Sequence, residues 1–109
     1  MPEIFDTIIL ELMFNRSEKS MISKDIVVQN QVGLHARPAT FFIQKANEFK
    51  SLITIAKDER KVNAKSLLGV LSLGITRGTS ITIEADGPDE EDAIKQLEEL
   101  VMSNFTDLD

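Results

Sequence analysis

The chain has a single histidine, His35, which lies immediately before a predicted helix. Arg37 follows two residues later, and Pro38 is tolerated in a helix only within the first turn. An unprotonated imidazole is a nucleophile near neutral pH. The N–H groups of a helix start stabilise an anion, and a guanidinium donates forked hydrogen bonds to phosphate oxygens. This spacing predicts a phosphorylatable His35, with Ala36 and Arg37 forming the phosphate-binding helix start.

A plainer interpretation of the same residues is also open. His35 would then cap the helix, and Arg37 would be a solvated surface charge. For a lone histidine this is the commoner situation, because a polar residue next to a helix start often serves only to cap it. The residue types and their spacing do not by themselves decide between the two.

Ser66 is placed at the start of a second, shorter helix. It precedes the short apolar segment 67–73, so it is placed as a helix N-cap, and Gly74 is placed to close that helix as a C-terminal cap. From the residues alone, Ser66 is predicted to be a cap and nothing more.

Three leucines of this short helix, Leu67, Leu68 and Leu71, cannot all point inward. We therefore expect part of the set to form an exposed apolar patch, and such patches often mark surfaces that bind partners. Partial burial of individual leucines against the sheet is the alternative.

Hydrophobic spacing predicts the elements that position these residues. Alternation from residue 22 to 28 indicates an edge or half-buried strand ending at Asn30-Gln31, and helical spacing over residues 39–49 places a helix start just after His35. Residues 51–57 and 61–64 flank a polar turn and predict a hairpin. A strand over 81–85 and a last helix beginning near Asp89 complete the order βαββαβα. That order indicates an α+β fold with helices on one face of a sheet.

The composition excludes several classes of function. A net charge of −6 and a pI near 4.7 argue against a nucleic-acid partner, which would need clustered cations. The absence of cysteine and the single histidine argue against a metal site, and no cofactor is expected. No apolar stretch is long enough to insert into a membrane, and the acidic start is unlike a secretory signal, so we expect a cytoplasmic protein. The acidic residues 90–92, 98 and 99 are expected to be the solvated side of the last helix.

Residues 21–109 are predicted to form one domain, and residues 1–20 an extension outside it. The extension has a helical stripe of apolar residues, which suits a docking helix. A helix this short is marginal without tertiary packing, so the extension is alternatively disordered. In a third interpretation Met21 is the natural start and the upstream stretch is a misassigned coding region.

Two segments of the chain resemble a known family. The run Gly33-Leu34-His35-Ala36-Arg37-Pro38-Ala39 closely resembles the active-site signature of the HPr phosphocarrier proteins of the phosphoenolpyruvate-dependent sugar phosphotransferase system. Residues 61–74 look like the regulatory serine segment of Gram-positive HPr proteins. The resemblance covers residues 22–104 and implies an open-faced β-sandwich, with four antiparallel strands and three helices on one face.

The resemblance also implies roles for the singled-out residues. His35 would accept phosphate from phosphorylated enzyme I and pass it to the IIA components of sugar transporters, so the protein would be a carrier without turnover of its own. Ser66 would be the target of an HPr kinase/phosphorylase in catabolite repression. Enzyme I, IIA and catabolite control protein A would then dock on the patch of Leu67, Leu68 and Leu71.

The chain departs from common family patterns at three positions. Leu68 and Leu71 stand where methionines are frequent, and Val32 replaces a small polar residue, so it offers no hydrogen bond toward the imidazole. Two other functions compete with a carrier role. One is a purely regulatory HPr-like protein that signals through Ser66, although related regulators of this kind lack the histidine. The other is a small α+β binding domain whose histidine is incidental.

Overall fold

The computed structural model describes residues 21–105. The predicted extension over residues 1–20, with its apolar stripe, therefore lies outside the described residues, as do residues 106–109. Within the described part the predicted order of elements is confirmed. The elements are β1 (Ile22–Val27), α2 (Ala36–Ala46), β2 (Leu52–Lys57), β3 (Arg60–Asn63), α3 (Leu67–Ser72), β4 (Ser80–Asp86) and α4 (Glu90–Met102).

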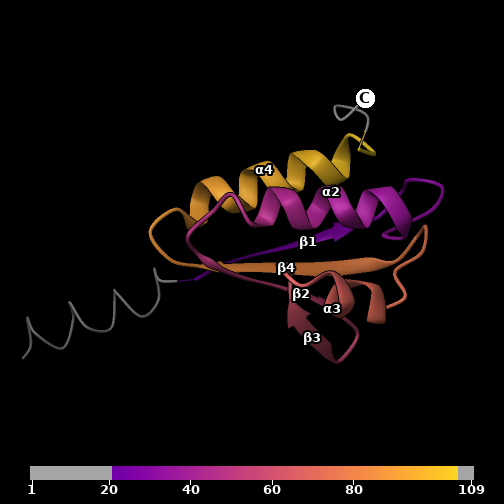
Figure 1. Ribbon diagram of the computed structural model, residues 1–109, viewed down its shortest axis with the longest axis horizontal. Helices are drawn as coiled ribbons and strands as arrows, with labels where there is room; N and C mark the ends of the chain where they lie inside the picture. The colour runs from indigo at the N-terminus through magenta and orange to yellow at the C-terminus, as the bar shows by residue number, and fades with distance from the viewer. Residues whose placement is uncertain (1–20, 106–109) are drawn as a thin grey trace, which may run out of the picture.

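The four strands form one antiparallel sheet in the spatial order β1-β4-β2-β3. Figure 1 shows α2 and α4 side by side along the sheet, with α3 beside the β2–β3 hairpin. This is an open-faced α+β sandwich. In β4 the alternate residues Ile81, Ile83 and Ala85 are buried, because a strand directs successive side chains to opposite faces of the sheet. On the uncovered face, Leu52 remains 61% exposed.

The helices supply the other half of the core. Phe42 from α2 and Leu97 from α4 are fully buried, and each of these helices places its apolar residues on the face turned to the sheet. Burying one such side chain contributes about 1.5–3 kcal/mol to folding. No helix of residues 21–105 is long and apolar enough to cross a membrane.

Two strand boundaries differ from the sequence prediction. The first strand ends at Val27 rather than near Asn30, because Val28 bonds to a turn instead of a strand: its N–H donates to Thr79 at 2.9 Å and its carbonyl accepts from Gly78 at 2.7 Å. The hairpin turn contains two residues rather than three. Asp58 takes a left-handed conformation with φ of 56°, which lets Arg60 pair with Lys57 in the ladder.

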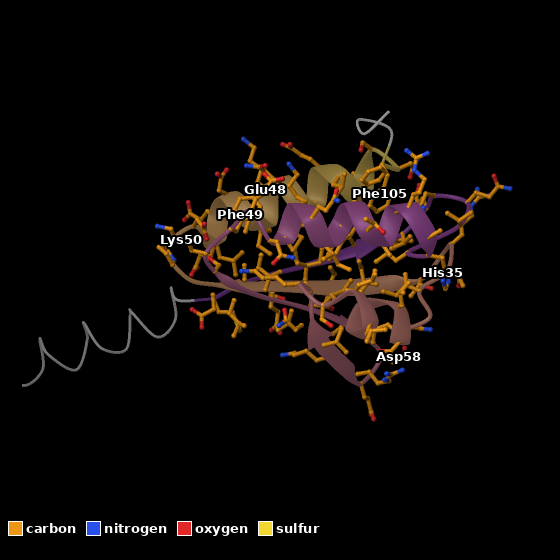
Figure 2. The ribbon with its side chains drawn as sticks, in the orientation of Figure 1. His35, Glu48, Phe49, Lys50, Asp58 and Phe105 are labelled. Atoms are coloured by element: carbon orange, nitrogen blue, oxygen red, sulfur yellow. The ribbon has the colours of Figure 1, made fainter. Side chains whose placement is uncertain are left out.

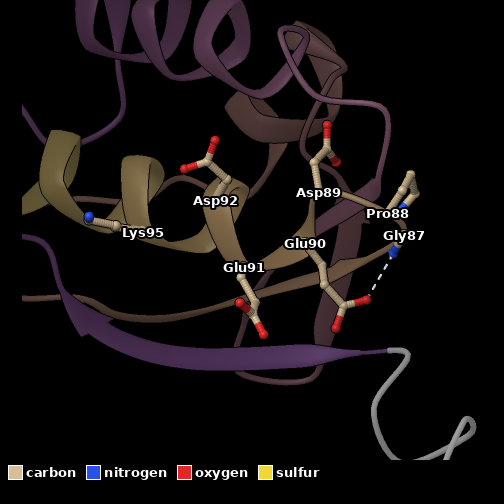
Figure 3. Close-up of a pocket in the computed structure, with 7 residues that line it drawn as sticks. All are labelled: Gly87, Pro88, Asp89, Glu90, Glu91, Asp92 and Lys95. Carbon is tan, nitrogen blue, oxygen red and sulfur yellow. Dashed lines mark hydrogen bonds between the residues drawn. The ribbon is translucent and has the colours of Figure 1, made fainter.

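Glu90 contradicts the expectation that the acidic run of the last helix is solvated. Its side chain is buried, and a carboxylate oxygen accepts a hydrogen bond from the Gly87 N–H at 3.1 Å (Figure 3). This bond closes the turn before α4, whose N-cap is Asp89. Glu91 and Asp92 are exposed, as expected. The prediction was wrong for Glu90 because burial here follows from the turn at Gly87.

The Asp89 carboxylate joins the start of α4 to the loop between α2 and β2, and we call its hydrogen bonds to Lys50 and Ser51 the Asp89 clasp. Its carboxylate accepts hydrogen bonds from the Lys50 N–H at 2.8 Å, the Ser51 N–H at 2.9 Å and the Ser51 hydroxyl at 2.5 Å. The Ser51 hydroxyl and then the Lys50 N–H lower the pKa of this carboxyl from 3.8 to about 2. All three bonds stabilise the charged form, so the clasp requires an ionised Asp89.

This pKa shift predicts an acid-dependent loss of stability. Because the pKa of Asp89 is lower in the folded state than in the unfolded state, its contribution is complete above about pH 4 and is lost as the pH falls toward 2. We expect Asp89→Asn to lower the thermal midpoint at pH 7 and to flatten its decline between pH 4 and pH 2. Asp92→Asn, at an exposed carboxylate on the same helix, serves as the control. If the thermal midpoints of Asp89→Asn and of the unmodified protein fell in parallel between pH 4 and pH 2, the stabilising role of the ionised Asp89 carboxylate would be contradicted.

Candidate functional site

His35 occupies the N-cap position of α2, with φ of −120° and ψ of 156°. Its side chain makes no capping hydrogen bond, and the residue is half-buried. Figure 2 shows it at the end of the domain opposite Lys50. His35 thus occupies the N-cap position without using its side chain as a cap.

The first turn of α2 has N–H groups available for an anion. The N–H groups at the start of a helix have no partners within the helix, and His35 does not supply one. No acidic residue lies in this turn, and Pro38 has no N–H of its own. The start of α2 thus has unpaired N–H groups and the positive end of the helix dipole, with no acidic residue to offset them.

Ala36, the first residue of α2, is exposed and has a left-handed φ of 52°. A residue with a Cβ in this region costs about 1 kcal/mol. The chain therefore bends sharply between the extended His35 and the regular helix. This bend separates His35 from the helical run that begins with Arg37.

Arg37 is exposed, and its guanidinium lies over the ring of Phe41 with Cζ 5.4 Å from the ring centroid. No hydrogen bond or ion pair joins Arg37 to another of residues 21–105. The structure thus brings Arg37 to the same helix start as His35, two positions along the chain. Its guanidinium rests on an aromatic face instead of an acidic partner.

The segment before His35 is a turn held by Asn30, a residue that the sequence analysis did not single out as functional. The Gly33 N–H donates to the Asn30 carbonyl at 3.2 Å, and the Asn30 side-chain amide donates to the Gly33 carbonyl at 2.8 Å. Asparagine and glycine three residues apart are typical of a β-turn, and this spacing was the available signal. Asn30 is buried, and among the described residues its Oδ1 atom has no hydrogen-bond partner.

The same turn is joined to the loop that leads into β4. The Leu34 N–H donates to the Ile75 carbonyl at 3.1 Å, and the Leu34 side chain is fully buried. Gly33 has φ of +62°, and a Cβ at this position would lie 2.3 Å from the Ile75 carbonyl oxygen. The close approach of these two backbones determines where His35 emerges at the surface.

Ser66 is the N-cap of α3, as predicted. Its hydroxyl oxygen accepts a hydrogen bond from the Gly69 N–H at 3.1 Å. At the other end of the helix, Lys57 donates to the carbonyls of Leu73 and Gly74, and Arg60 donates to that of Ser72 at 2.7 Å. Gly74 has φ of +62°, consistent with its predicted role as a C-terminal cap. Both ends of α3 therefore have side-chain or backbone partners.

The three leucines of α3 differ in exposure. Leu68 is 81% exposed and Leu67 is 43% exposed, whereas Leu71 is half-buried against the core. The expectation that part of this set is exposed is confirmed, and the apolar patch consists chiefly of Leu67 and Leu68.

An open hollow in the surface lies at the other end of the domain from His35. It is lined by residues 87–92 and Lys95, and Figure 3 shows four carboxylate-bearing residues in succession, Asp89, Glu90, Glu91 and Asp92. Such a site would repel a phosphate. In residues 21–105 no group of three or more histidine, cysteine or acidic residues could hold a metal ion. The helix start at His35 is therefore the better candidate site.

The contact at Gly33 generates a test of how the site is positioned. We expect Gly33→Ala to reduce the free energy of unfolding by about 2–4 kcal/mol, from overpacking against Ile75 together with left-handed strain. Gly74→Ala is the matched control, because Gly74 has the same φ but nothing within 4 Å of an added Cβ. The free energy of unfolding of this control variant should fall by only about 1 kcal/mol. Equal losses in urea unfolding of the two variants would show that the approach to Ile75 does not constrain Gly33.

Comparisons with known proteins agree with this geometry. Residues 22–103 match the family model described as "PTS HPr component phosphorylation site". The HPr-like protein Crh of Bacillus subtilis is 44% identical over 77 residues, which cover 71% of this chain and 91% of that protein.

Solved structures also share the fold, among them two HPr proteins. HPr-C-His from Thermoanaerobacter tengcongensis has a TM-score of 0.76 and 48% identity, covering 77% of this chain and 94% of that chain. The phosphocarrier protein HPr from Bacillus anthracis has a TM-score of 0.74 and 44% identity, covering 76% and 99% respectively. With the uncapped helix start at His35, these matches show that the chain belongs to the HPr family of phosphocarrier proteins.

Proposed function

We propose that the protein carries phosphate on His35 between enzyme I and the IIA components of sugar transporters. The observation that carries this proposal is the helix start itself. The His35 side chain is not used as a cap, the first-turn N–H groups are available, and Arg37 lies on the same turn. A carrier site needs these features, because the phosphoryl group must arrive from one protein and leave to another.

The chemistry is a phosphoryl transfer in two directions. An unprotonated imidazole nitrogen of His35 attacks phosphorus as the bond from phosphorus to the donor breaks. The first-turn N–H groups and the Arg37 guanidinium stabilise the charge on the phosphoryl oxygens. Transfer to the acceptor reverses these steps and restores the free imidazole. The protein is thus a carrier and not an enzyme, and it needs no cofactor for this function.

The partners follow from the same proposal. The exposed leucines Leu67 and Leu68, with the half-buried Leu71, form the docking surface for enzyme I, IIA and catabolite control protein A. HPr kinase/phosphorylase modifies Ser66 at the N-terminus of α3, where a phosphate is favoured by the dipole. We assign the carrier to the cytoplasm, with no direct nucleic-acid partner and no membrane insertion, and residues 21–109 as the domain that performs this function.

A second candidate function is regulation without sugar-linked phosphotransfer. It is favoured by the relatives named HPr-like protein Crh, which include the Bacillus subtilis protein and one from Halalkalibacterium halodurans. In this alternative, Ser66 would be the only phosphorylated residue and His35 would be idle. We favour the carrier because His35, Arg37 and Pro38 are all present at the helix start.

Phosphorylation with enzyme I and phosphoenolpyruvate separates the two functions. We expect a mass increase of one phosphoryl group that is labile to acid, as a phosphohistidine is, and His35→Ala should abolish it while leaving the fold intact. Arg37→Ala should slow the transfer without abolishing it, because the backbone N–H groups still face the phosphate. Label only on Ser66, obtained with ATP and the kinase, would favour the regulator. Acid-labile label that persists in His35→Ala would refute the assignment of His35.

Charge at Ser66 is expected to weaken the phosphorylation of His35. Ser66 lies next to Leu67 and Leu68, so a negative charge there opposes docking of an acidic partner, and ~1.4 kcal/mol is a tenfold change in affinity. We expect Ser66→Asp to raise the apparent KM for enzyme I by up to tenfold and to leave the saturated rate unchanged. Ser66→Ala controls for loss of the hydroxyl cap. Identical apparent affinities for the three proteins would exclude regulation by charge at Ser66.

A further inference from the structure

We propose that Phe41 is a positioning residue for Arg37, an inference that rests on the phosphocarrier function proposed above. The Cζ atom of Arg37 lies 5.4 Å from the centroid of the Phe41 ring. This separation is within the roughly 6 Å range of a cation–π interaction. The ring thereby restrains the guanidinium along the first turns of α2, the helix whose N-cap is His35.

The helix geometry explains the contact. Arg37 and Phe41 are four residues apart in α2, so they lie on the same face. Side chains of a helix point back toward its N-terminus, which brings the ring of Phe41 to the turn that contains Arg37. The contact therefore lies at the end of the helix where the phosphate is proposed to bind.

The two side chains differ in how firmly they are held. Phe41 is half-buried and packs against the core, so its ring is a fixed surface. Arg37 is exposed, and among residues 21–105 it has no hydrogen bond or ion pair. No acidic residue lies in the first turn to attract it. The aromatic ring is thus the one specific contact of Arg37 within the described chain.

The neighbouring Phe42 shows that Phe41 is not needed simply to fill the core. Phe42 is fully buried between the helix and the sheet, whereas part of Phe41 faces solvent. A smaller aliphatic residue would suffice for the packing role of a half-buried position. The aromatic face at position 41 provides something that an aliphatic side chain does not, namely a surface for the guanidinium.

Contact with an aromatic face leaves the phosphate-binding groups of Arg37 unoccupied. The Phe41 ring carries no carboxylate or carbonyl oxygen, so this contact leaves the five N–H donors of the guanidinium without a competing acceptor. The ring also restricts a long side chain that would otherwise lose many rotamers when it binds phosphate. Phe41 therefore increases the share of Arg37 conformers that are ready to accept a phosphoryl group.

The test uses phosphoramidate, a small phosphoryl donor, so that it does not depend on any partner protein. The rate of phosphorylation of His35 is measured for Phe41→Leu and Phe41→Tyr, each with Arg37 present and in the Arg37→Ala background. The proton chemical shifts of the Arg37 side chain are measured on the same proteins. Thermal unfolding of each variant checks that the fold is retained.

If Phe41 positions Arg37, Phe41→Leu slows phosphorylation about two- to fivefold when Arg37 is present, the range expected for an exposed cation–π contact. It has no effect in the Arg37→Ala background, and Phe41→Tyr restores the rate. The upfield ring-current shift of the Arg37 side-chain protons disappears in Phe41→Leu and persists in Phe41→Tyr.

Two results would overturn the proposal. One is a set of proton chemical shifts for the Arg37 side chain that is the same in Phe41→Leu as in the unmodified protein. The other is an equal loss of rate with and without Arg37, which would show a structural effect of Phe41 alone. Failure of enzyme I to phosphorylate the unmodified protein would instead refute the carrier function, because the phosphoramidate rates are obtained without enzyme I.

Discussion

The site depends on one close approach between two backbone segments, the turn before α2 and the loop before β4. The Leu34 N–H donates to the Ile75 carbonyl, and Gly33 packs against the same carbonyl with no room for a side chain. Leu34 is consequently buried in the core, and the next residue along the chain, His35, is half-buried at the surface. The position of the histidine is thus a consequence of the packing on either side of it.

The N-termini of the three described helices differ in their capping bonds and acidic residues, and the difference matches the chemistry proposed at His35. The helix α3 is capped by the Ser66 hydroxyl, and the turn before α4 is closed by the Glu90 carboxylate. The N-cap side chains of α2 and α4 make no capping bond. The first turn of α4 contains Glu90, Glu91 and Asp92, whereas the first turn of α2 has no acidic residue and Ala36 has a left-handed conformation. A missing cap and a strained residue each cost about 1 kcal/mol, which a core of this size can offset. The uncapped helix start without acidic residues is the one beside His35.

The distribution of charge is consistent with this assignment although the whole chain is acidic. The acidic residues 89–92 gather at the start of α4, at the opposite end of the domain from His35 (Figures 2 and 3). There the Asp89 carboxylate is occupied by the Lys50 and Ser51 groups of the loop that follows α2. The acidic cluster is thus separated from the helix start at which we propose that a phosphoryl group binds, so the net charge of −6 does not argue against the proposal.

The sequence by itself determined the order of the elements, the helix starts after His35 and Ser66, and the exposure of part of the leucine set. These features follow from local physics: apolar spacing, the fixed φ of Pro38 and the preference of serine for an N-cap. The sequence did not indicate the strand order β1-β4-β2-β3, the burial of Glu90, or the clasp between Asp89 and Ser51. Nor did it show that the Phe41 ring lies against the guanidinium of Arg37. Only the tertiary structure decided these, because each depends on how much surface a neighbouring element covers, and residue spacing does not specify which distant segments come into contact.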